Sequence, residues 1–238
     1  MDYKEIILDD NGKIFTINEK NIYNKSFIEA LKFHEPGLAP VCDETGWYHI
    51  KTDGSPLYSE RYKRCFGYYY GIAAVIDSSN NWFHIDTKSI RVYEQNYKWS
   101  GNYQEDVCTV RDSSDNYFHI DKKGNKIYSD LYSYAGDFKD SYACVRLQNG
   151  YFKHIDLNGK DLNGHLYKDL GVFHKNFATA KDNIGWFHID KLGNNIYQER
   201  YLMIEPFYNG FALVEDLSGN KKVIDEKGVV TLTLTTTP

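Results

Sequence analysis

The chain has 238 residues, of which 28 are basic and 33 acidic, giving a formal net charge of −5. Basic residues never cluster beyond the pairs Lys122-Lys123 and Lys221-Lys222, and neutralising a nucleic-acid backbone requires a basic patch, so we expect no nucleic-acid partner. The first residues contain only a three-residue apolar run and no later stretch reaches membrane-spanning length, so we expect no membrane association and a cytoplasmic location.

The composition favours β structure. Aromatic residues make up 16% of the chain, and tyrosine alone supplies 21 of them. A tyrosine ring buries apolar area while its hydroxyl keeps a hydrogen bond, which suits thin sheets in which core and surface are one residue apart.

A histidine recurs along the chain inside an apolar string of the type Trp-Phe-His-Ile-Asp. Successive copies of this histidine are separated by 35, 35, 35 and 34 residues. A fixed period of this length is typical of a repeat array. The five histidines are His49, His84, His119, His154 and His188.

Further columns keep the same register. A glycine stands five residues after four of the five histidines, with Ser89 as the exception, and a tyrosine stands nine residues after them, with Asn163 as the exception. An aromatic residue stands nineteen residues after each. The column thirteen residues after each histidine is tyrosine throughout: Tyr62, Tyr97, Tyr132, Tyr167 and Tyr201.

The register predicts one repeat domain over residues 1–238. Both ends carry degraded copies that lack the histidine and the preceding tryptophan, as expected for caps with a neighbour on one side only. We predict an N-terminal cap over 1–45, a C-terminal partial cap over 220–238, and five full repeats over 46–80, 81–115, 116–150, 151–184 and 185–219.

Each repeat is predicted to form short strands joined by turns. The Trp-Phe-His-Ile string forms one strand, the Ile-Tyr segment a second and Ala-x-Val a third, and the Asp that follows Ile caps a turn that ends in glycine. The fold class is therefore all-β, with 35-residue hairpin or meander repeats in an open solenoid-like array. The alternative is a closed six-bladed β-propeller.

The pattern Phe207-x-x-Gly210-x-Ala212-x-Val214, followed by a polar turn and then aromatic-x-Ile-Asp-x-x-Gly, resembles the bacterial WG repeat, a β-rich family. This chain departs from the family in that Phe or Tyr replaces the glycine of Trp-Gly, as in Trp82-Phe83. The resemblance implies no established reaction, and it implies a binding or interaction module.

The registered histidines allow two interpretations. A ladder of imidazoles is suited to binding a transition metal or to acid–base chemistry. Each histidine, however, lies in an apolar strand and repeats like a core column, so we predict structural histidines bonded to a tyrosine hydroxyl or a backbone carbonyl, together with structural roles for the invariant tyrosines. We expect no metal and no cofactor.

The sequence contains no catalytic constellation. It has no Gly-x-Ser-x-Gly, no His-Glu-x-x-His and no phosphate-binding glycine loop. Near-identical repeats do not create the single unlike arrangement that an active site requires, so we predict that the chain is not an enzyme.

One segment departs from the pattern in a way that indicates binding. Tyr68, Tyr69 and Tyr70 stand together between two glycines, whereas the positions of Tyr69 and Tyr70 are held by Lys139 and Asp140 two repeats later. Three consecutive tyrosines cannot all be buried in alternating geometry. We therefore predict an aromatic ligand site at these residues, against the alternative that they pack on a neighbouring repeat.

The first functional hypothesis is a non-catalytic scaffold that binds a protein partner on its extended surface, because the units of an array vary independently. A second is a carbohydrate-binding module that uses exposed tyrosine and tryptophan. A third is an array that targets a catalytic domain carried on another chain.

Overall fold

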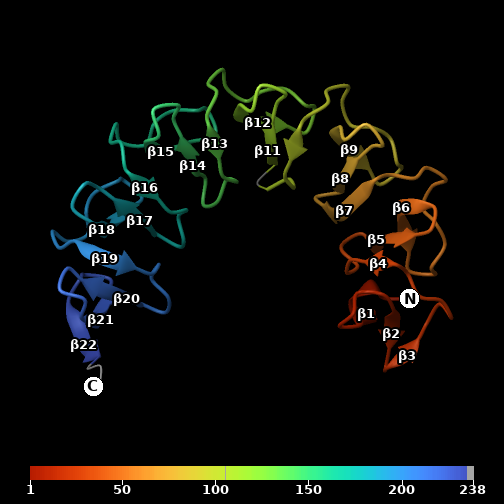
Figure 1. The fold of residues 1–238 in the computed structure, drawn as a ribbon, viewed down its shortest axis with the longest axis horizontal. Helices are drawn as coiled ribbons and strands as arrows, with labels where there is room; N and C mark the ends of the chain where they lie inside the picture. The colour runs from red at the N-terminus through yellow and green to blue at the C-terminus, as the bar shows by residue number, and fades with distance from the viewer. Residues whose placement is uncertain (105, 235–238) are drawn as a thin grey trace. The chain divides into compact units, whose positions relative to one another are not determined.

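The computed structural model describes residues 1–104 and 106–234, and these residues form short antiparallel strands with a single 3-10 turn (Figure 1). The chain divides into two compact units, residues 1–126 and 127–238. The polar end of the predicted C-terminal cap, residues 235–238, lies outside the described residues.

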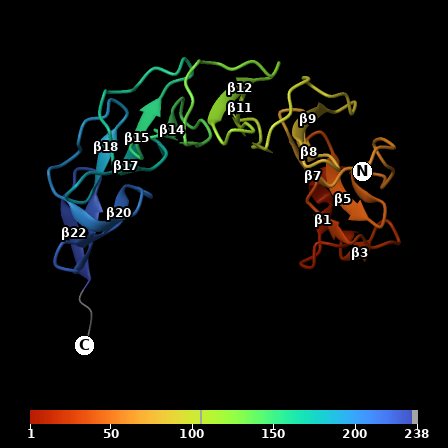
Figure 2. The same ribbon diagram turned by 45° about the horizontal axis from the view of Figure 1, so that its top comes forward.

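Within its described residues, the first unit contains four three-stranded sheets whose strands pair in chain order (Figure 2). The 3-10 turn η1 (Tyr3–Glu5) precedes them. The sheets are β1 (Ile7–Leu8), β2 (Phe15–Ile17) and β3 (Lys20–Asn21); β4 (Glu29–Ala30), β5 (Leu38–Asp43) and β6 (Gly46–Lys51); β7 (Arg64–Tyr69), β8 (Ile72–Ile76) and β9 (Trp82–Asp86); and β10 (Trp99–Ser100), β11 (Val107–Arg111) and β12 (Tyr117–Asp121).

The second unit contains one three-stranded sheet and one continuous seven-stranded sheet, again paired in chain order. The three-stranded sheet consists of β13 (Tyr134–Ala135), β14 (Ala143–Arg146) and β15 (Phe152–Ile155). The other consists of β16 (Asp169–Leu170), β17 (Phe177–Lys181), β18 (Trp186–Asp190), β19 (Tyr201–Ile204), β20 (Phe211–Asp216), β21 (Lys221–Asp225) and β22 (Val230–Leu234).

The prediction of an all-β tandem array is confirmed. Among the described residues, the terminal strands β1 and β22 each pair inside their own unit, with β2 and β21 respectively. This pairing agrees with an open array, in which the two ends of the chain do not complete one sheet together.

The middle and last strands of each sheet form its core. In β11 and β12, Cys108 lies opposite Ile120 and Val110 lies opposite Phe118, and all four side chains are buried. Because three consecutive residues of β12, Phe118 to Ile120, are buried, both faces of this strand are covered. That is why the Trp-Phe-His-Ile strings show no alternation of polar and apolar residues.

The aspartate after each Ile caps a turn, as predicted. One carboxylate oxygen of Asp121 accepts hydrogen bonds from the backbone nitrogens of Lys123 and Asn125, at 2.8 Å each. The same pair of bonds, to the second and fourth residues onward, forms at Asp86, Asp156, Asp190 and Asp225.

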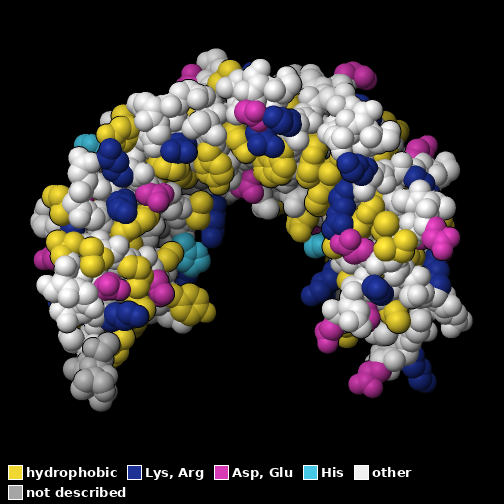
Figure 3. Space-filling view, viewed as in Figure 1, with side chains coloured by type: hydrophobic (Ala, Val, Ile, Leu, Met, Phe, Trp, Pro, Cys, Tyr) yellow, Lys and Arg dark blue, Asp and Glu magenta, His cyan; other side chains and the backbone are white. Residues whose placement is uncertain are grey.

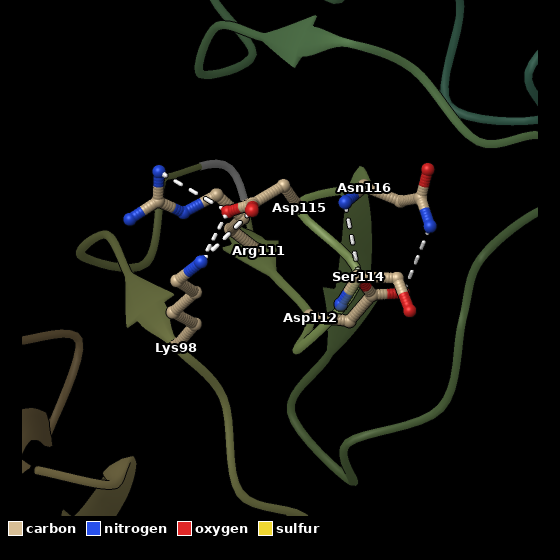
Figure 4. Close-up of polar contacts among 6 residues, drawn as sticks. All are labelled: Lys98, Arg111, Asp112, Ser114, Asp115 and Asn116. Atoms are coloured by element: carbon tan, nitrogen blue, oxygen red, sulfur yellow. Dashed lines mark hydrogen bonds and ion pairs between the residues drawn. The ribbon is translucent and has the colours of Figure 1, made fainter.

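The turns between β11 and β12 and their equivalents use the same device. Asp112 accepts from the backbone nitrogens of Ser114 and Asn116 at 2.9 Å each (Figure 4). In the same turn the carboxylate of Asp115 receives the ammonium of Lys98 at 2.8 Å. This ion pair is half-exposed, so the aspartate-to-backbone bonds define the turn more than the charges do.

The structure differs from the prediction at the Ile-Tyr segments, which do not form strands. In the first full repeat the backbone of Leu57 donates to the carbonyl of His49 at 2.8 Å, and Trp47 and Tyr62 exchange two backbone bonds of 2.9 Å. The segment therefore curls back over its own strand. The physical reason is that the hydroxyl of Tyr58 must reach the His49 ring of the same repeat, which a straight paired strand would not allow.

A buried histidine connects each sheet to the strand that begins the next one. Nε2 of His84, in β9, lies 3.1 Å from the carbonyl oxygen of Gly101, which follows β10. A carbonyl only accepts, so Nε2 carries the proton and Nδ1 accepts from the hydroxyl of Tyr93. Both ring nitrogens are therefore satisfied by neutral partners.

The same geometry recurs in other repeats. In His49, Nδ1 lies 2.5 Å from the Tyr58 hydroxyl and Nε2 lies 2.8 Å from the carbonyl of Phe66. In His188 the corresponding distances are 2.6 Å to Tyr197 and 3.0 Å to the carbonyl of Glu205. His119 is also fully buried at the equivalent position.

Two aromatic columns extend this connection. The ring nineteen residues after each histidine packs on the imidazole, with centroid distances of 4.9 Å for Tyr103 on His84 and 3.9 Å for Phe207 on His188. The invariant tyrosines reach the Phe of the following repeat, as Tyr97 does with Phe118 at 6.0 Å. Tyr97, Tyr132, Tyr167 and Tyr201 are buried and Tyr62 is half-buried.

The glycine column completes the contact between repeats. Gly124 has a φ of +79° and lies against the ring of Tyr93 from the preceding repeat, so a Cβ there would come within 2.6 Å of Cγ of that ring. Gly228 meets Tyr197 in the same way. Glycine is therefore needed here both for the left-handed backbone and for the close approach of a ring.

The Asn163 exception leaves a defect in the network. Its side-chain nitrogen bonds to the Tyr167 hydroxyl at 3.0 Å and to the carbonyl of Gly193 at 3.2 Å, so it does not reach His154. Nε2 of His154 still donates to Gly171, but the buried Nδ1 has no partner. An unsatisfied buried nitrogen costs about 1–3 kcal/mol of stability.

Acidification is expected to unfold the protein. Burial lowers the pKa of His49, His84, His154 and His188 from 6.5 to about 4. The unfolded chain binds more protons than the folded one between these values, so the stabilisation is complete above pH 6.5 and is lost as the pH falls toward 4. Each such imidazole contributes a slope of about 1.4 kcal/mol per pH unit.

The free energy of unfolding from urea titrations at a series of pH values checks this prediction. A decrease with a slope corresponding to several protons is expected, and it should be the same with zinc or with a chelator. A free energy that stays constant between pH 6.5 and 4.5, or one that depends on metal, would contradict neutral structural histidines.

Gly124→Ala is expected to destabilise the fold by about 1–3 kcal/mol more than Gly71→Ala. Both glycines have nearly the same φ, +79° and +78°, so the backbone strain of an alanine is matched. A Cβ at Gly71 meets nothing within 4 Å, whereas one at Gly124 meets the Tyr93 ring. Thermal or urea melts of the two variants measure the difference, and equal losses would refute the contact.

Asn163→Tyr is expected to stabilise the fold by about 1 kcal/mol, because a tyrosine hydroxyl would satisfy Nδ1 of His154 as Tyr93 does for His84. Asn163→Phe adds the same ring without the hydroxyl and serves as the control. Urea titration should rank the tyrosine variant above the phenylalanine variant. A phenylalanine variant that is equally stable would show that the hydroxyl makes no such bond.

Candidate binding site

One turn position repeats with the period of the array but varies in residue type. It lies where the first strand of a sheet turns into the second, and each member pairs through its backbone with a residue a few positions onward. Core columns keep one residue type because packing constrains them, so a varying column indicates a surface free of that constraint. This turn row consists of His34, Tyr69 and Gln104 in the first unit and Lys139, His174 and Tyr208 in the second.

Neighbouring members of the turn row are in contact. The rings of His34 and Tyr69 lie 4.9 Å apart between centroids. In the second unit, the ammonium of Lys139 lies 3.4 Å from Nδ1 of His174. Within each unit the turns thus form a continuous edge rather than isolated loops.

The first unit has a groove along this edge. Its volume is about 750 Å³ and its walls come from three successive turns, residues 34–36, residues 68–71 and Gln104, with Thr87 at the side. A hollow of this size accommodates a short peptide or a small ligand. We call it the turn groove.

The three consecutive tyrosines have different environments. Tyr68 is buried, its ring packs on His49 at 4.7 Å and its hydroxyl donates to the carbonyl of Asp86 at 3.0 Å. Tyr69 is half-buried against His34. Tyr70 is 62% exposed. Tyr68 therefore has the contacts of a core residue, while Tyr69 and Tyr70 offer ring surface to the groove.

The backbone of Tyr70 is strained without any compensation from burial. Its φ is +52°, in the left-handed region that bulky side chains rarely adopt. Asp140, at the equivalent turn position two repeats later, has the same φ of +52°, and an aspartate tolerates this conformation better. An exposed aromatic ring held at a cost of about 1 kcal/mol or more is a feature typical of recognition sites.

The turn groove carries little net charge. Burial lowers the pKa of His34, so its imidazole is neutral near pH 7. Lys122 lies 5.6 Å from the Tyr70 ring centre, and its ammonium is paired with Asp106 at 2.5 Å. On the face drawn in Figure 3, lysine and arginine are scattered among other side chains. The groove thus suits a neutral or apolar ligand rather than a polyanion.

A second aromatic row runs through the first unit but has few open ring faces. Phe66 and Trp82 are stacked at 5.0 Å, Trp82 and Trp99 lie 6.4 Å apart, and Trp99 and Tyr117 lie 6.1 Å apart. The guanidinium of Arg64 lies 4.0 Å above Trp47. Stacking of a sugar requires an open aromatic face, and in this row neighbouring side chains cover the faces.

The described residues give no chemistry for a reaction or a metal. The histidines whose contacts are given above face carbonyls and hydroxyls, and no group of three or more His, Cys, Asp or Glu in the described part of the chain is arranged to hold a metal ion. The cysteines are free thiols, and burial raises the pKa of Cys65 and Cys144 to about 12. No helix among the described residues is long and apolar enough to cross a bilayer.

Sequence reasoning did not identify the groove residues His34, Pro36 and Gln104. A signal was present, because His34 and His174 lie outside the histidine column and differ by four periods of 35 residues. That spacing defines the turn row. The sequence could not show that consecutive turns would lie close enough to enclose a groove.

Comparison with known structures supports the fold alone. A computationally designed protein, Ika8, is 12% identical, with a TM-score of 0.50 over 97% of this chain and 84% of the other. BamB from Moraxella catarrhalis is 11% identical, with a TM-score of 0.49 over 98% and 86%. The C-terminal WD40 domain of Sif2 is 10% identical, with a TM-score of 0.43 over 85% and 67%. No curated protein matches the sequence.

The repeats themselves match a known family model, described as the WG containing repeat, at residues 119–152 and 186–218. Each matched segment begins at or just before a column histidine and includes the invariant tyrosine, the nineteenth-position aromatic and the Ala-x-Val strand. The resemblance to WG repeats that the sequence indicates is thereby confirmed for these two repeats.

Proposed function

We propose that the chain is a non-catalytic scaffold that binds a protein partner, and that the turn groove of the first unit receives a segment of that partner. The observation that carries this proposal is Tyr70, an exposed ring on a left-handed backbone at the rim of a groove. The half-buried ring of Tyr69 forms the wall beside it, and Tyr68 supports both from below.

The character of the groove favours an extended peptide with apolar or proline side chains. Its walls consist of aromatic rings, a proline and a neutral imidazole, and its acidic rim residue is Glu35. Aromatic-lined grooves bind extended peptides because the flat rings contact the peptide side chains at little entropic cost. The variation along the turn row then provides specificity, since each repeat presents a different side chain to the partner.

Replacing Tyr69 and Tyr70 by Lys and Asp is expected to weaken binding by about 1–3 kcal/mol, which is the scale for loss of an aromatic hot spot. This pair already occupies the equivalent turn at Lys139 and Asp140, where the second residue has the same φ, so the fold should be retained. Peptides selected from a displayed library against the unmodified protein, measured by fluorescence anisotropy, provide the probe, and thermal melts check the fold.

Tyr208→Lys is the matched control, because it removes an exposed tyrosine from the same turn position in the second unit, away from the groove. It should leave peptide affinity unchanged. A double variant that melts well below the unmodified protein would show that the tyrosines are packing residues. Binding on a glycan array that the double variant abolishes, with no peptide binding, would favour the carbohydrate hypothesis instead.

A further inference from the structure

The last strand of the second unit, β22, is an edge strand that lacks the usual protection. Among the described residues it pairs only with β21, and all five of its residues are exposed. It contains no charge and no proline. Edge strands of natural proteins are commonly kept short, charged or interrupted by proline, because their free backbone groups otherwise pair with another strand.

The contrast with the first sheet of the chain makes this lack of protection specific. The edge strand β3 has two residues, one of them Lys20, and it follows Asn18 and Glu19, which both have left-handed backbones. That edge is short and charged, whereas β22 is longer and uncharged. We propose that β22 pairs antiparallel with β22 of a second copy of this chain.

The sequence of β22 is complementary to itself. In an antiparallel pair centred on Leu232, each Leu232 faces its counterpart, Thr231 faces Thr233, and Val230 faces Leu234. Every pair thus joins residues of the same character, two threonines or two branched apolar side chains, and no charge faces a like charge. A two-fold axis through Leu232 makes the contact closed, so it yields a dimer rather than a fibre.

The pairing also covers apolar surface that is otherwise exposed. The exposed fractions of Val230, Leu232 and Leu234 are 45%, 54% and 40%. On β22 these residues alternate with threonine, and the partner strand would bring the same alternation into register. Two five-residue strands bury less area than a standard interface, so the dimer is weak, with a dissociation constant of about 10 μM to 1 mM.

Sedimentation velocity of the full chain over a concentration series tests the proposal. The unmodified protein should shift from monomer to dimer as the concentration rises toward about 1 mM. Leu232→Lys places two ammonium groups opposite each other at the centre of the pair, and Leu232→Glu places two carboxylates there. Each variant alone should be monomeric, with dimerisation weakened about tenfold or more.

A mixture of the two variants should restore the dimer, because lysine then faces glutamate only if position 232 faces itself across the contact. The control is Leu217→Lys, which changes a residue of equal exposure, 55%, in the turn before β21, and it should dimerise as the unmodified protein does. A monomer at every concentration overturns the proposal. So does a dimer that persists in Leu232→Lys, or variants that fail to pair with each other when mixed.

Discussion

The neutral imidazole buried in each repeat is the interaction on which the rest of the array depends. A single ring such as His84 donates through Nε2 to a backbone carbonyl beyond its own sheet and accepts through Nδ1 from a tyrosine of its own repeat. An apolar side chain could fill the space but would leave that carbonyl without a donor. Because the strands are only two to six residues long, such a bond contributes more to order here than it would in a large sheet.

The imidazole also explains why the aromatic columns repeat so strictly. The ring nineteen residues onward covers one face of the histidine and keeps water away from its bonds, and the tyrosine nine residues onward supplies the hydroxyl. The glycine of the next repeat then lies directly on that tyrosine. Each column is thus constrained by another, which is the reason a change in one column, as at Asn163, leaves a measurable defect in its neighbour His154.

The turn row follows the opposite rule. Its members keep the spacing of the array but take part in none of these core contacts, so their side chains are free to vary. This separation, with constant residues inside and varying residues on one edge, is how repeat proteins combine one fold with different partners. Tyr70 illustrates the separation, since a ring that contributes nothing to the core is held in a strained conformation at the rim of the groove.

The sequence by itself determined the period, the β class, the core columns and the turn-capping role of the aspartates, because each of these depends on residues close together in the chain or repeated at a fixed distance. It did not determine the Ile-Tyr segment, which was expected to be a strand, since the geometry of the Tyr58 hydroxyl and the His49 ring overrides local strand propensity. The donor that joins successive sheets was also hidden, because backbone carbonyls such as that of Gly101 carry no signal in the amino-acid sequence. Only the tertiary structure decided that Tyr68 is buried while Tyr70 is exposed, and that the turns holding His34, Tyr69 and Gln104 lie close enough to form a groove. The physical reason is that a groove depends on distances between segments a full repeat apart, and these are set by how the sheets pack rather than by any one repeat.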